Sequence, residues 1–226
     1  MCRGASHGAP CYSTHLMIYL IGGPPRCGKT TAANMLSKKL HVPWFPTDYM
    51  EAVVSQYIPD NDTQEPYPLT NLRHTTHKSN DRFYADFSAE KIIAMYRGKA
   101  KMTWPGLRAF IEYAAYEHRS FILEGLHIDP VLLHDLPSDT ENFIKYVFLY
   151  RVNENEIEKG FANSTEKHDW VLEHTKNPET FAKIAAMIQG YGVLIRDDAE
   201  QEKLPAICMD GNFNALLKQA VDFLAQ

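Results

Sequence analysis

The chain has 226 residues, of which 45% are hydrophobic and 23% are charged, and its formal net charge is −5. This length and balance are typical of one sizeable globular domain with room for a small lid or insert. The negative charge excludes a general basic field that would attract nucleic acid or an anionic membrane, so any phosphate ligand requires a local site.

The four cysteines are too few for a disulfide scaffold, and none of them forms a CxxC pair. A reducing cytoplasm is therefore the expected location. The apolar run at residues 16–21 is far shorter than the ~18 residues that a membrane span requires. Residues 1–14 lack the apolar core of a signal peptide and are expected to form a disordered tail.

The predicted elements alternate between strands and helices, which favours a parallel sheet covered on both faces. Residues 15–21 form the first strand, which ends at two glycines. In chain order, the remaining elements are expected as a helix at 29–40, a strand at 43–45, a helix at 48–57, helices at 88–97 and 103–119, strands at 120–124 and 145–150, helices at 153–163 and 178–203, a strand at 206–209 and a helix at 212–225. A break is considered near residues 190–192, and residues 59–79 have the composition of a long loop.

One motif carries the strongest chemical signal. Residues 23–30 read GPPRCGKT, which matches GxxxxGK[ST] at every fixed position and lies between a strand and a helix. Backbone N–H groups of such a loop point at a phosphate, its lysine reaches the β- and γ-phosphates, and its threonine completes a magnesium shell. The expected phosphate-binding residues are Gly23, Pro24, Pro25, Arg26, Cys27, Gly28, Lys29, Thr30 and Thr31.

Two acidic residues follow predicted strands, at the sheet edge where α/β proteins bind ligands. Asp48 follows the second strand and is either a catalytic base or a helix cap. Glu124 ends the third strand, where burial of its charge is costly unless it has a role, and we expect it to hold Mg²⁺ or the acceptor. His127 lies nearby, but a lone histidine in a loop is more often structural.

Basic residues that could stabilise a transferring phosphate are scarce after the fourth strand. Arg151 ends that strand and is a candidate nucleotide ligand, whereas the next segment offers Lys159 and Lys167 but no arginine. Cys27 either has a lowered pKa, because it precedes a helix and a lysine, or is simply a small residue tolerated in the loop.

With these features in place, the chain resembles the small-molecule and nucleotide kinases of the P-loop class, which include adenylate, shikimate and gluconate kinases and chloramphenicol phosphotransferase. It is most similar to 2-phosphoglycerate kinase-like proteins. The segments that carry this resemblance are residues 21–30, 44–48, 103–106 and 122–128.

The resemblance implies a three-layer α/β/α fold, with a five-stranded parallel sheet ordered 2-3-1-4-5 in a domain spanning 15–226. An acceptor-side insert at 47–119 and a lid at 153–176 would belong to it. ATP would lie at the P-loop with its adenine near Asp210 and Gly211. Mg²⁺ would lie at Thr30 and Glu124, and the acceptor near Asp48 and Glu124.

Three functions remain open. The first is an ATP- and Mg²⁺-dependent kinase of a small-molecule hydroxyl, with Lys29, Asp48 and Glu124 in catalysis. The second is a nucleoside monophosphate kinase, whose acceptor phosphate would need arginines such as Arg73, Arg82 and Arg108. The third is a non-catalytic ATP-binding regulatory module. Segments 59–79 and 153–176 are expected to close over bound substrates, with Lys159 or Lys167 moving toward the phosphates.

Overall fold

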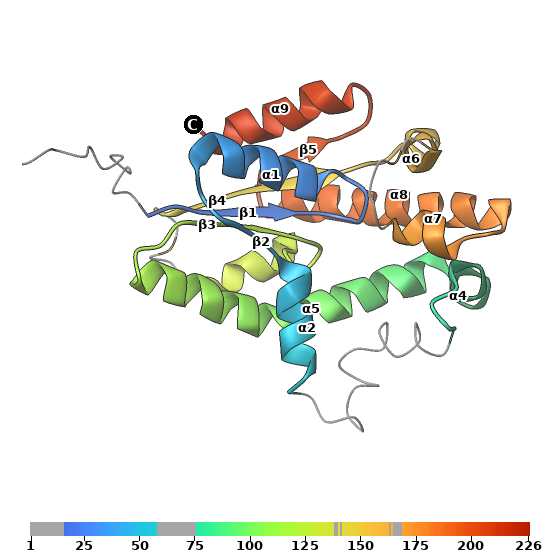
Figure 1. Ribbon diagram of the computed structural model, residues 1–226, viewed down its shortest axis with the longest axis horizontal. Coiled ribbons are helices and arrows are strands. Elements are labelled where there is room, and N and C mark those ends of the chain that lie inside the picture. The colour runs from blue at the N-terminus through green and yellow to red at the C-terminus, as the bar shows by residue number, and fades with distance from the viewer. Residues whose placement is uncertain (1–15, 58–75, 138–139, 141, 163, 165–168) are drawn as a thin grey trace, which may run out of the picture.

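The computed structural model describes residues 16–57, 76–137, 140, 142–162, 164 and 169–226. Its five strands form one sheet in which all neighbouring strands are parallel, in the order β2-β3-β1-β4-β5 (Figure 1). The strands are β1 (Ile18–Gly22), β2 (Trp44–Pro46), β3 (Phe121–Glu124), β4 (Ile144–Tyr150) and β5 (Ala206–Cys208). The predicted strand order is confirmed, whereas the predicted tail at 1–14 and most of the predicted loop at 59–79 lie outside the described residues.

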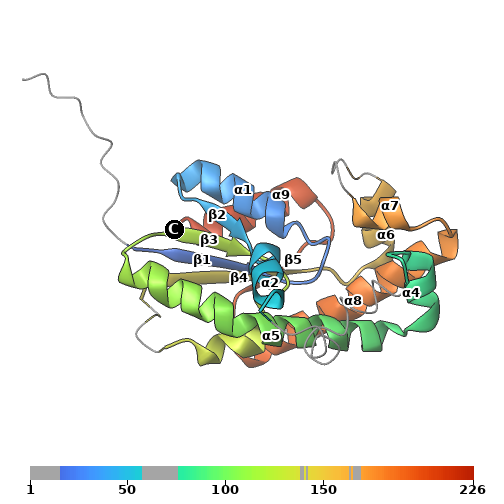
Figure 2. The ribbon, with the colours of Figure 1, turned by 60° about the horizontal axis from the view of Figure 1, so that its bottom comes forward.

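The helices form a layer on each face of the sheet, with α1 and α9 on one side and α5 and α8 on the other (Figures 1 and 2). The described helices are α1 (Lys29–Leu40), α2 (Thr47–Ser55), α4 (Asn80–Asp86), α5 (Ala89–Tyr116), the 3-10 helix η1 (Pro130–Asp135), α6 (Glu154–Ala162), α7 (Trp170–His174), α8 (Pro178–Gln201) and α9 (Phe213–Leu224). None of the helices in the described ranges is both long and apolar enough to cross a membrane.

Strand β1 shows why the sheet needs both helical layers. Its side chains alternate between the two faces, so Ile18 and Leu20 pack with buried residues of α5 and α8. Tyr19 and Ile21 pack on the other face, with buried residues of α1 and α9. A strand that is apolar on both faces is stable only at the centre of a covered parallel sheet.

One predicted helix break is wrong, and a second break that the sequence left open is absent. Helix α5 runs without interruption through Pro105, where two helices with Thr103 as a cap were expected. Proline inside a helix costs about 3 kcal/mol, but residues on both sides of it, such as Tyr96 and Leu107, are buried in the same core. Helix α8 is likewise continuous through residues 190–192. Burial of one long apolar face thus outweighs the local signals for a break.

The parallel register brings the carboxyl ends of the strands together at one edge. Glu124 at the end of β3 pairs with Ile21 of β1 and with Pro46 of β2. On the other side of β1, Gly22 pairs with Phe148 of β4. The segments that follow β1, β2, β3 and β4 therefore begin close to one another. Helix α7 lies within the predicted lid, whereas α4 lies between the predicted loop and the next predicted helix, where no element was expected.

Candidate active site

The loop between β1 and α1 has a backbone that favours glycine at two positions. Gly23 has φ 131°, and a Cβ there would lie 2.0 Å from the carbonyl oxygen of Leu149 in β4. Gly28 has φ 87° and precedes the first residue of α1. The Lys29 side chain is buried, and its Nζ donates a hydrogen bond to the carbonyl oxygen of Pro24 at 2.6 Å. The lysine therefore lies across its own loop, as a phosphate cradle requires.

A hydroxyl and a carboxylate meet beside this loop. Thr30 Oγ1 donates a hydrogen bond to Glu124 Oε1 at 3.0 Å, which joins the first turn of α1 to the end of β3. Glu124 is only 5% exposed, so its carboxylate is a buried polar group at the mouth of the sheet. A hydroxyl and a carboxylate oxygen are ligands that suit Mg²⁺, and these two residues fit the predicted metal role.

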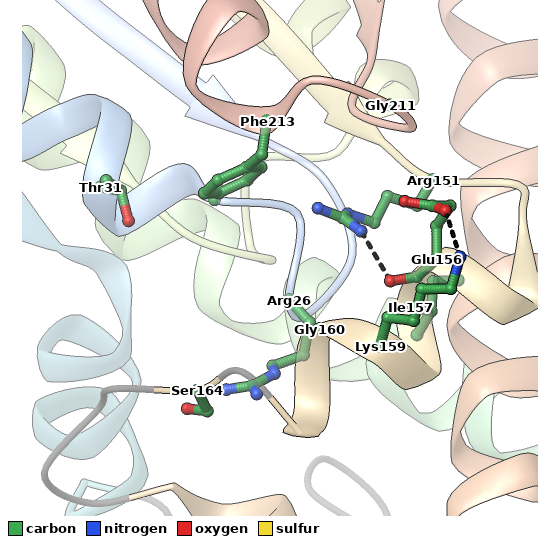
Figure 3. A pocket seen from close by; sticks show the side chains of 11 residues that line it. Arg26, Thr31, Arg151, Glu156, Ile157, Lys159, Gly160, Ser164, Gly211 and Phe213 are labelled. Carbon is green, nitrogen blue, oxygen red and sulfur yellow. Dashed lines mark hydrogen bonds and ion pairs between the residues drawn. The ribbon is translucent and has the colours of Figure 1, made fainter.

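One cavity of about 400 Å³ lies on the α6 and α9 side of the loop. Figure 3 shows the Arg151 guanidinium between the Phe213 ring and the backbone of α6. Its Nη1 donates to the Glu156 carbonyl oxygen at 3.1 Å, and its Cζ lies 5.3 Å from the centre of the Phe213 ring. Lys159 is paired with the Glu156 carboxylate at 3.0 Å. Arg151 and Phe213 therefore place a cation and an aromatic ring side by side in the lining of this cavity.

Of the two residues predicted in the loop after β5, one lines this cavity and the other does not. Gly211 lines it, as predicted. Asp210 does not, because its Oδ2 accepts hydrogen bonds from the backbone N–H groups of Val152 and Asn153 at 2.9 and 3.1 Å. Asp210 therefore fastens the β5 loop to the turn between β4 and α6. Its predicted contact with the nucleotide remains a prediction.

A second cavity, of about 390 Å³, lies on the opposite side of the loop. The two strand-end acids, Asp48 and Glu124, both line it together with Lys29. Asp48 lies in the first turn of α2 and its side chain is 69% exposed, in contrast to the buried Glu124. The expectation that the acids after β2 and β3 would face one space thus agrees with their positions. Tyr96 of α5 and Trp170 of α7 also line the cavity.

A buried histidine network supports the helix that carries Asp48. His127 is fully buried, its Nδ1 lies 2.8 Å from Thr47 Oγ1, and its Nε2 lies 3.0 Å from Glu51 Oε2. Lys99 of α5 completes the network with its Nζ 2.7 Å from the same Glu51 oxygen. The sequence alone left open whether His127 is functional or structural. Its role depends on a partner that lies 80 residues away in the chain. Thr47 and Glu51 share one face of α2, but the helix predicted from the sequence began only at residue 48.

The same network contains a group that could hold a metal ion. One ligand atom each from Asp48, Glu51 and His127 lies within 4.8 Å of the others. The Lys99 ammonium already supplies a positive charge at the Glu51 carboxylate. Burial alone would raise the pKa of Glu51, but hydrogen bonds from His127 and Lys99 and the charge of Lys99 outweigh it and lower that pKa. This cluster is therefore satisfied by its own side chains.

Arg26 is a predicted loop residue with a position that the sequence did not indicate. Its φ is 65°, in the left-handed region, and its side chain extends toward the α6 and α7 segment (Figure 3). Its Nη2 lies 2.9 Å from Asp169 Oδ2, and its Cζ lies 5.6 Å from the centre of the Phe161 ring. Burial alone would raise the pKa of Asp169, but a hydrogen bond from Ser164 and the charge of Arg26 outweigh it and lower that pKa.

Cys27 is a buried side chain of the loop, fully shielded from solvent. Burial raises the pKa of its thiol to about 11, although Lys29 and Arg151 act in the opposite direction. The thiol is therefore protonated at neutral pH. This contradicts the lowered pKa that the sequence allowed, whereas the tolerance of a small residue at this loop position stays a prediction.

The arginines needed by a nucleoside monophosphate kinase are not brought together in the part of the chain that the structure describes. Arg73 lies outside that part. Arg82 is exposed at α4, and Arg108 is half-exposed and pairs with Glu112 of its own helix at 3.4 Å. Neither of these two lines either cavity.

Comparisons with known proteins agree with this geometry at the level of the fold. No protein-family model matches the sequence, and no curated protein matches it significantly. Among solved structures, a gluconokinase from Sinorhizobium meliloti superimposes with a TM-score of 0.50 at 13% identity, covering 92% of this chain and 91% of that one. The chain has the fold of the P-loop kinases.

Two further solved structures are similar at comparable coverage. A shikimate kinase from Bacteroides thetaiotaomicron has a TM-score of 0.47 and 12% identity, covering 93% of this chain and 99% of its own. A sugar kinase from a Janibacter species has a TM-score of 0.49 and 14% identity, covering 93% of this chain and 95% of its own. The identities are so low that the likeness concerns the fold alone, and the reaction has to be argued from the site.

Proposed function

We propose that this protein is an ATP- and Mg²⁺-dependent kinase that transfers the γ-phosphate of ATP to a hydroxyl group of a small molecule. The observation that carries the proposal is the position of the phosphate loop between two separate cavities. Arg26, Gly28 and Thr31 line both of them. A transferase needs one space for its donor and another for its acceptor, with the transferring group between them.

The donor side is the cavity lined by Arg151, Gly211 and Phe213. ATP would lie there with its phosphates on the loop amides and on Lys29. The Lys29 bond to Pro24 would be exchanged for contacts with phosphate oxygens, which are stronger acceptors for an ammonium. Bound Mg²⁺ would neutralise phosphate charge, and the Thr30 hydroxyl and the Glu124 carboxylate are the groups to hold it.

The acceptor side is the cavity that contains Asp48. An acceptor hydroxyl placed there would attack the γ-phosphorus as the bond to the β-phosphate oxygen breaks and ADP leaves. Asp48 would orient the hydroxyl and accept its proton, because its carboxylate is exposed and lines this cavity. The buried Thr47–His127–Glu51 network keeps the first turn of α2 in place for this role.

The identity of the acceptor is a finer question. The resemblance favours an acceptor like 2-phosphoglycerate, and the fold neighbours act on gluconate, shikimate and sugars by name. A nucleoside monophosphate is the second candidate. We also propose that the segment at 153–176 closes over bound substrates as a lid, and that the protein is cytoplasmic.

The first experiment measures ATP–Mg²⁺ binding by calorimetry and ATP consumption with each of these acceptors. Lys29→Ala should lose binding or turnover, whereas Lys38→Ala, which changes an exposed lysine of the same helix, should not. Asp48→Asn should bind ATP normally and lose transfer, with the exposed Asp86→Asn as its control. The binding measurement separates the two variants, since only the first changes a phosphate ligand.

Two results would contradict the proposal. Wild-type ATP affinity in Lys29→Ala would show that the loop is not the nucleotide site. Tight ATP binding without transfer to any acceptor in a broad metabolite panel would favour a non-catalytic regulatory module. Stabilisation by a nucleoside monophosphate alone, measured as a thermal shift, would favour the nucleoside monophosphate kinase.

A further inference from the structure

Phosphoryl transfer needs positive charge near the γ-phosphate. Charge spreads over the three equatorial oxygens in the transition state, and an arginine directed at them is worth roughly 10³–10⁵ in kcat in P-loop enzymes. The segment after β4 contains no arginine between residues 152 and 176 that could supply this charge from a lid. Of the residues that the structure describes around the acceptor cavity, the cationic ones are Arg26 and Lys29.

Lys29 already serves as the lysine of the phosphate loop, so Arg26 is the remaining cation between the donor and acceptor spaces. It lines both cavities, and its backbone lies in the left-handed region at φ 65°, a conformation that glycine would adopt with less strain. A strained non-glycine residue in a phosphate loop suggests that its side chain is used. The guanidinium is only 11% exposed, so it acts in a desolvated environment where charge interactions are strong.

The side chain is held on two sides by the segment after β4. Phe161 of α6 lies against the guanidinium, with 5.6 Å between the arginine Cζ and the ring centre. Asp169, which is 3% exposed, forms an ion pair with it at 2.9 Å. Asp169 is itself fixed as the cap of α7, because its Oδ1 accepts hydrogen bonds from the N–H groups of Val171 and Leu172. The orientation of Arg26 is thus set by residues of the predicted lid.

We propose that Arg26 is the arginine that stabilises the transferring phosphoryl group, and that Asp169 is a positioning residue that aims it. This inference rests on the proposed kinase function. The usual arrangement, in which a lid carries the arginine, would be reversed here, since the phosphate loop carries the arginine and the lid carries its partner. Neither residue transfers a proton or forms a covalent bond, because the guanidinium acts by charge and hydrogen bonding alone.

The test uses ATP hydrolysis by the full chain, which requires no knowledge of the acceptor, together with calorimetric binding of ATP–Mg²⁺. Arg26→Gln should lower kcat by about 10³-fold while ATP affinity changes much less, because the lost interaction is made in the transition state. Arg26→Lys should recover only part of the rate, since a single ammonium cannot reproduce the fork of a guanidinium. Arg82→Gln, at an exposed arginine outside both cavities, is the control.

Asp169→Asn tests the positioning role while the cap of α7 is kept. Asparagine caps a helix about as well as aspartate, so α7 keeps its cap while the charge that holds Arg26 is lost. We expect a fall in kcat and also a lower melting temperature, because the buried Arg26 charge loses its partner. The kcat values are therefore compared at a temperature at which both proteins are folded. In the double variant with Arg26→Gln, the kcat should equal that of Arg26→Gln alone, because the two residues act as one unit.

The outcomes distinguish this inference from the proposed function. Failure of the wild type to bind ATP–Mg²⁺ would overturn the proposed function and this assignment with it. Wild-type hydrolysis combined with an unchanged kcat in Arg26→Gln would overturn this assignment alone. So would an additive loss in the double variant, or an Arg26→Gln effect confined to ATP affinity, since Arg26 would then act only in the ground state.

Discussion

Replacing glycine by alanine is expected to change the free energy of unfolding in opposite directions at two glycines inside long helices. At Gly98 in α5, an added Cβ would meet no atom within 4 Å. At Gly192 in α8, it would lie 1.9 Å from the carbonyl oxygen of Arg151, where real Cβ atoms essentially never come within 3.0 Å. Helix α8 and the end of β4 would have to separate by about 1 Å to admit the methyl group, and close-packed interiors resist such a shift.

The expected magnitudes follow from these contacts. Alanine in place of glycine gains roughly 0.5–1 kcal/mol within a helix, so Gly98→Ala should raise the free energy of unfolding by that amount. Gly192→Ala has the same gain, but overpacking costs about 1–3 kcal/mol, and a backbone obstacle cannot rotate away. Because the helix gain is common to both variants, they should differ by about 1–3 kcal/mol, with Gly192→Ala the less stable.

Urea unfolding followed by circular dichroism measures this difference, provided that the slope with denaturant is the same in both variants. Calorimetry with ATP–Mg²⁺ gives a second readout, since movement of the Arg151 backbone would disturb the side chain that lines the donor cavity. Equal stability of the two variants would refute the reasoning. It would mean that α8 moves away from β4 without cost and that Gly192 is not required for close packing.

The pKa of Glu51 is lowered, so the stability that it contributes is present above its ordinary pKa of 4.5 and is lost as the pH falls below that value. In Glu51→Gln, the free energy of unfolding, measured by urea at a series of pH values, should therefore fall less steeply at acid pH. An unchanged fall would contradict the His127 network. Cys27 should resist a thiol reagent at pH 8 in the native protein and react after denaturation, as peptide mapping would show; rapid native labelling would disprove its burial. Gly125→Ala should destabilise the fold, because Gly125 has φ 154° and a Cβ there would lie 1.8 Å from Thr47 Oγ1; a melting temperature equal to that of the wild type would contradict this.

The phosphate loop and the acids at the strand ends were predictable because their requirements are local. The phosphate loop needs glycines at two positions of its backbone and a lysine at the start of the following helix, and a short segment of sequence specifies all three. The acids that end or follow β2 and β3 were also recognisable, since parallel strands bring their carboxyl ends to one edge. Asp48 and Glu124 line one cavity for this reason.

The positions of the supporting side chains were not predictable in the same way. Thr47 and His127 lie 80 residues apart in the chain, and no local pattern states that they hydrogen-bond. Arg26 could have pointed to solvent, to a phosphate or to the lid, and its pairing with Asp169 depends on where α7 packs. Such contacts are decided by the docking of whole elements, after each element's own sequence preferences have been met.

The sequence by itself determined the phosphate loop, the alternation of strands and helices, and the acids at the strand ends, because backbone geometry and hydrophobic periodicity act over a few residues. Only the tertiary structure decided that α5 continues through Pro105, that Gly192 admits the end of β4, and that the loop arginine is held by the lid. The physical reason is that burial of long apolar faces outweighs local helix signals, and that a side chain in a loop takes its direction from partners distant in the chain.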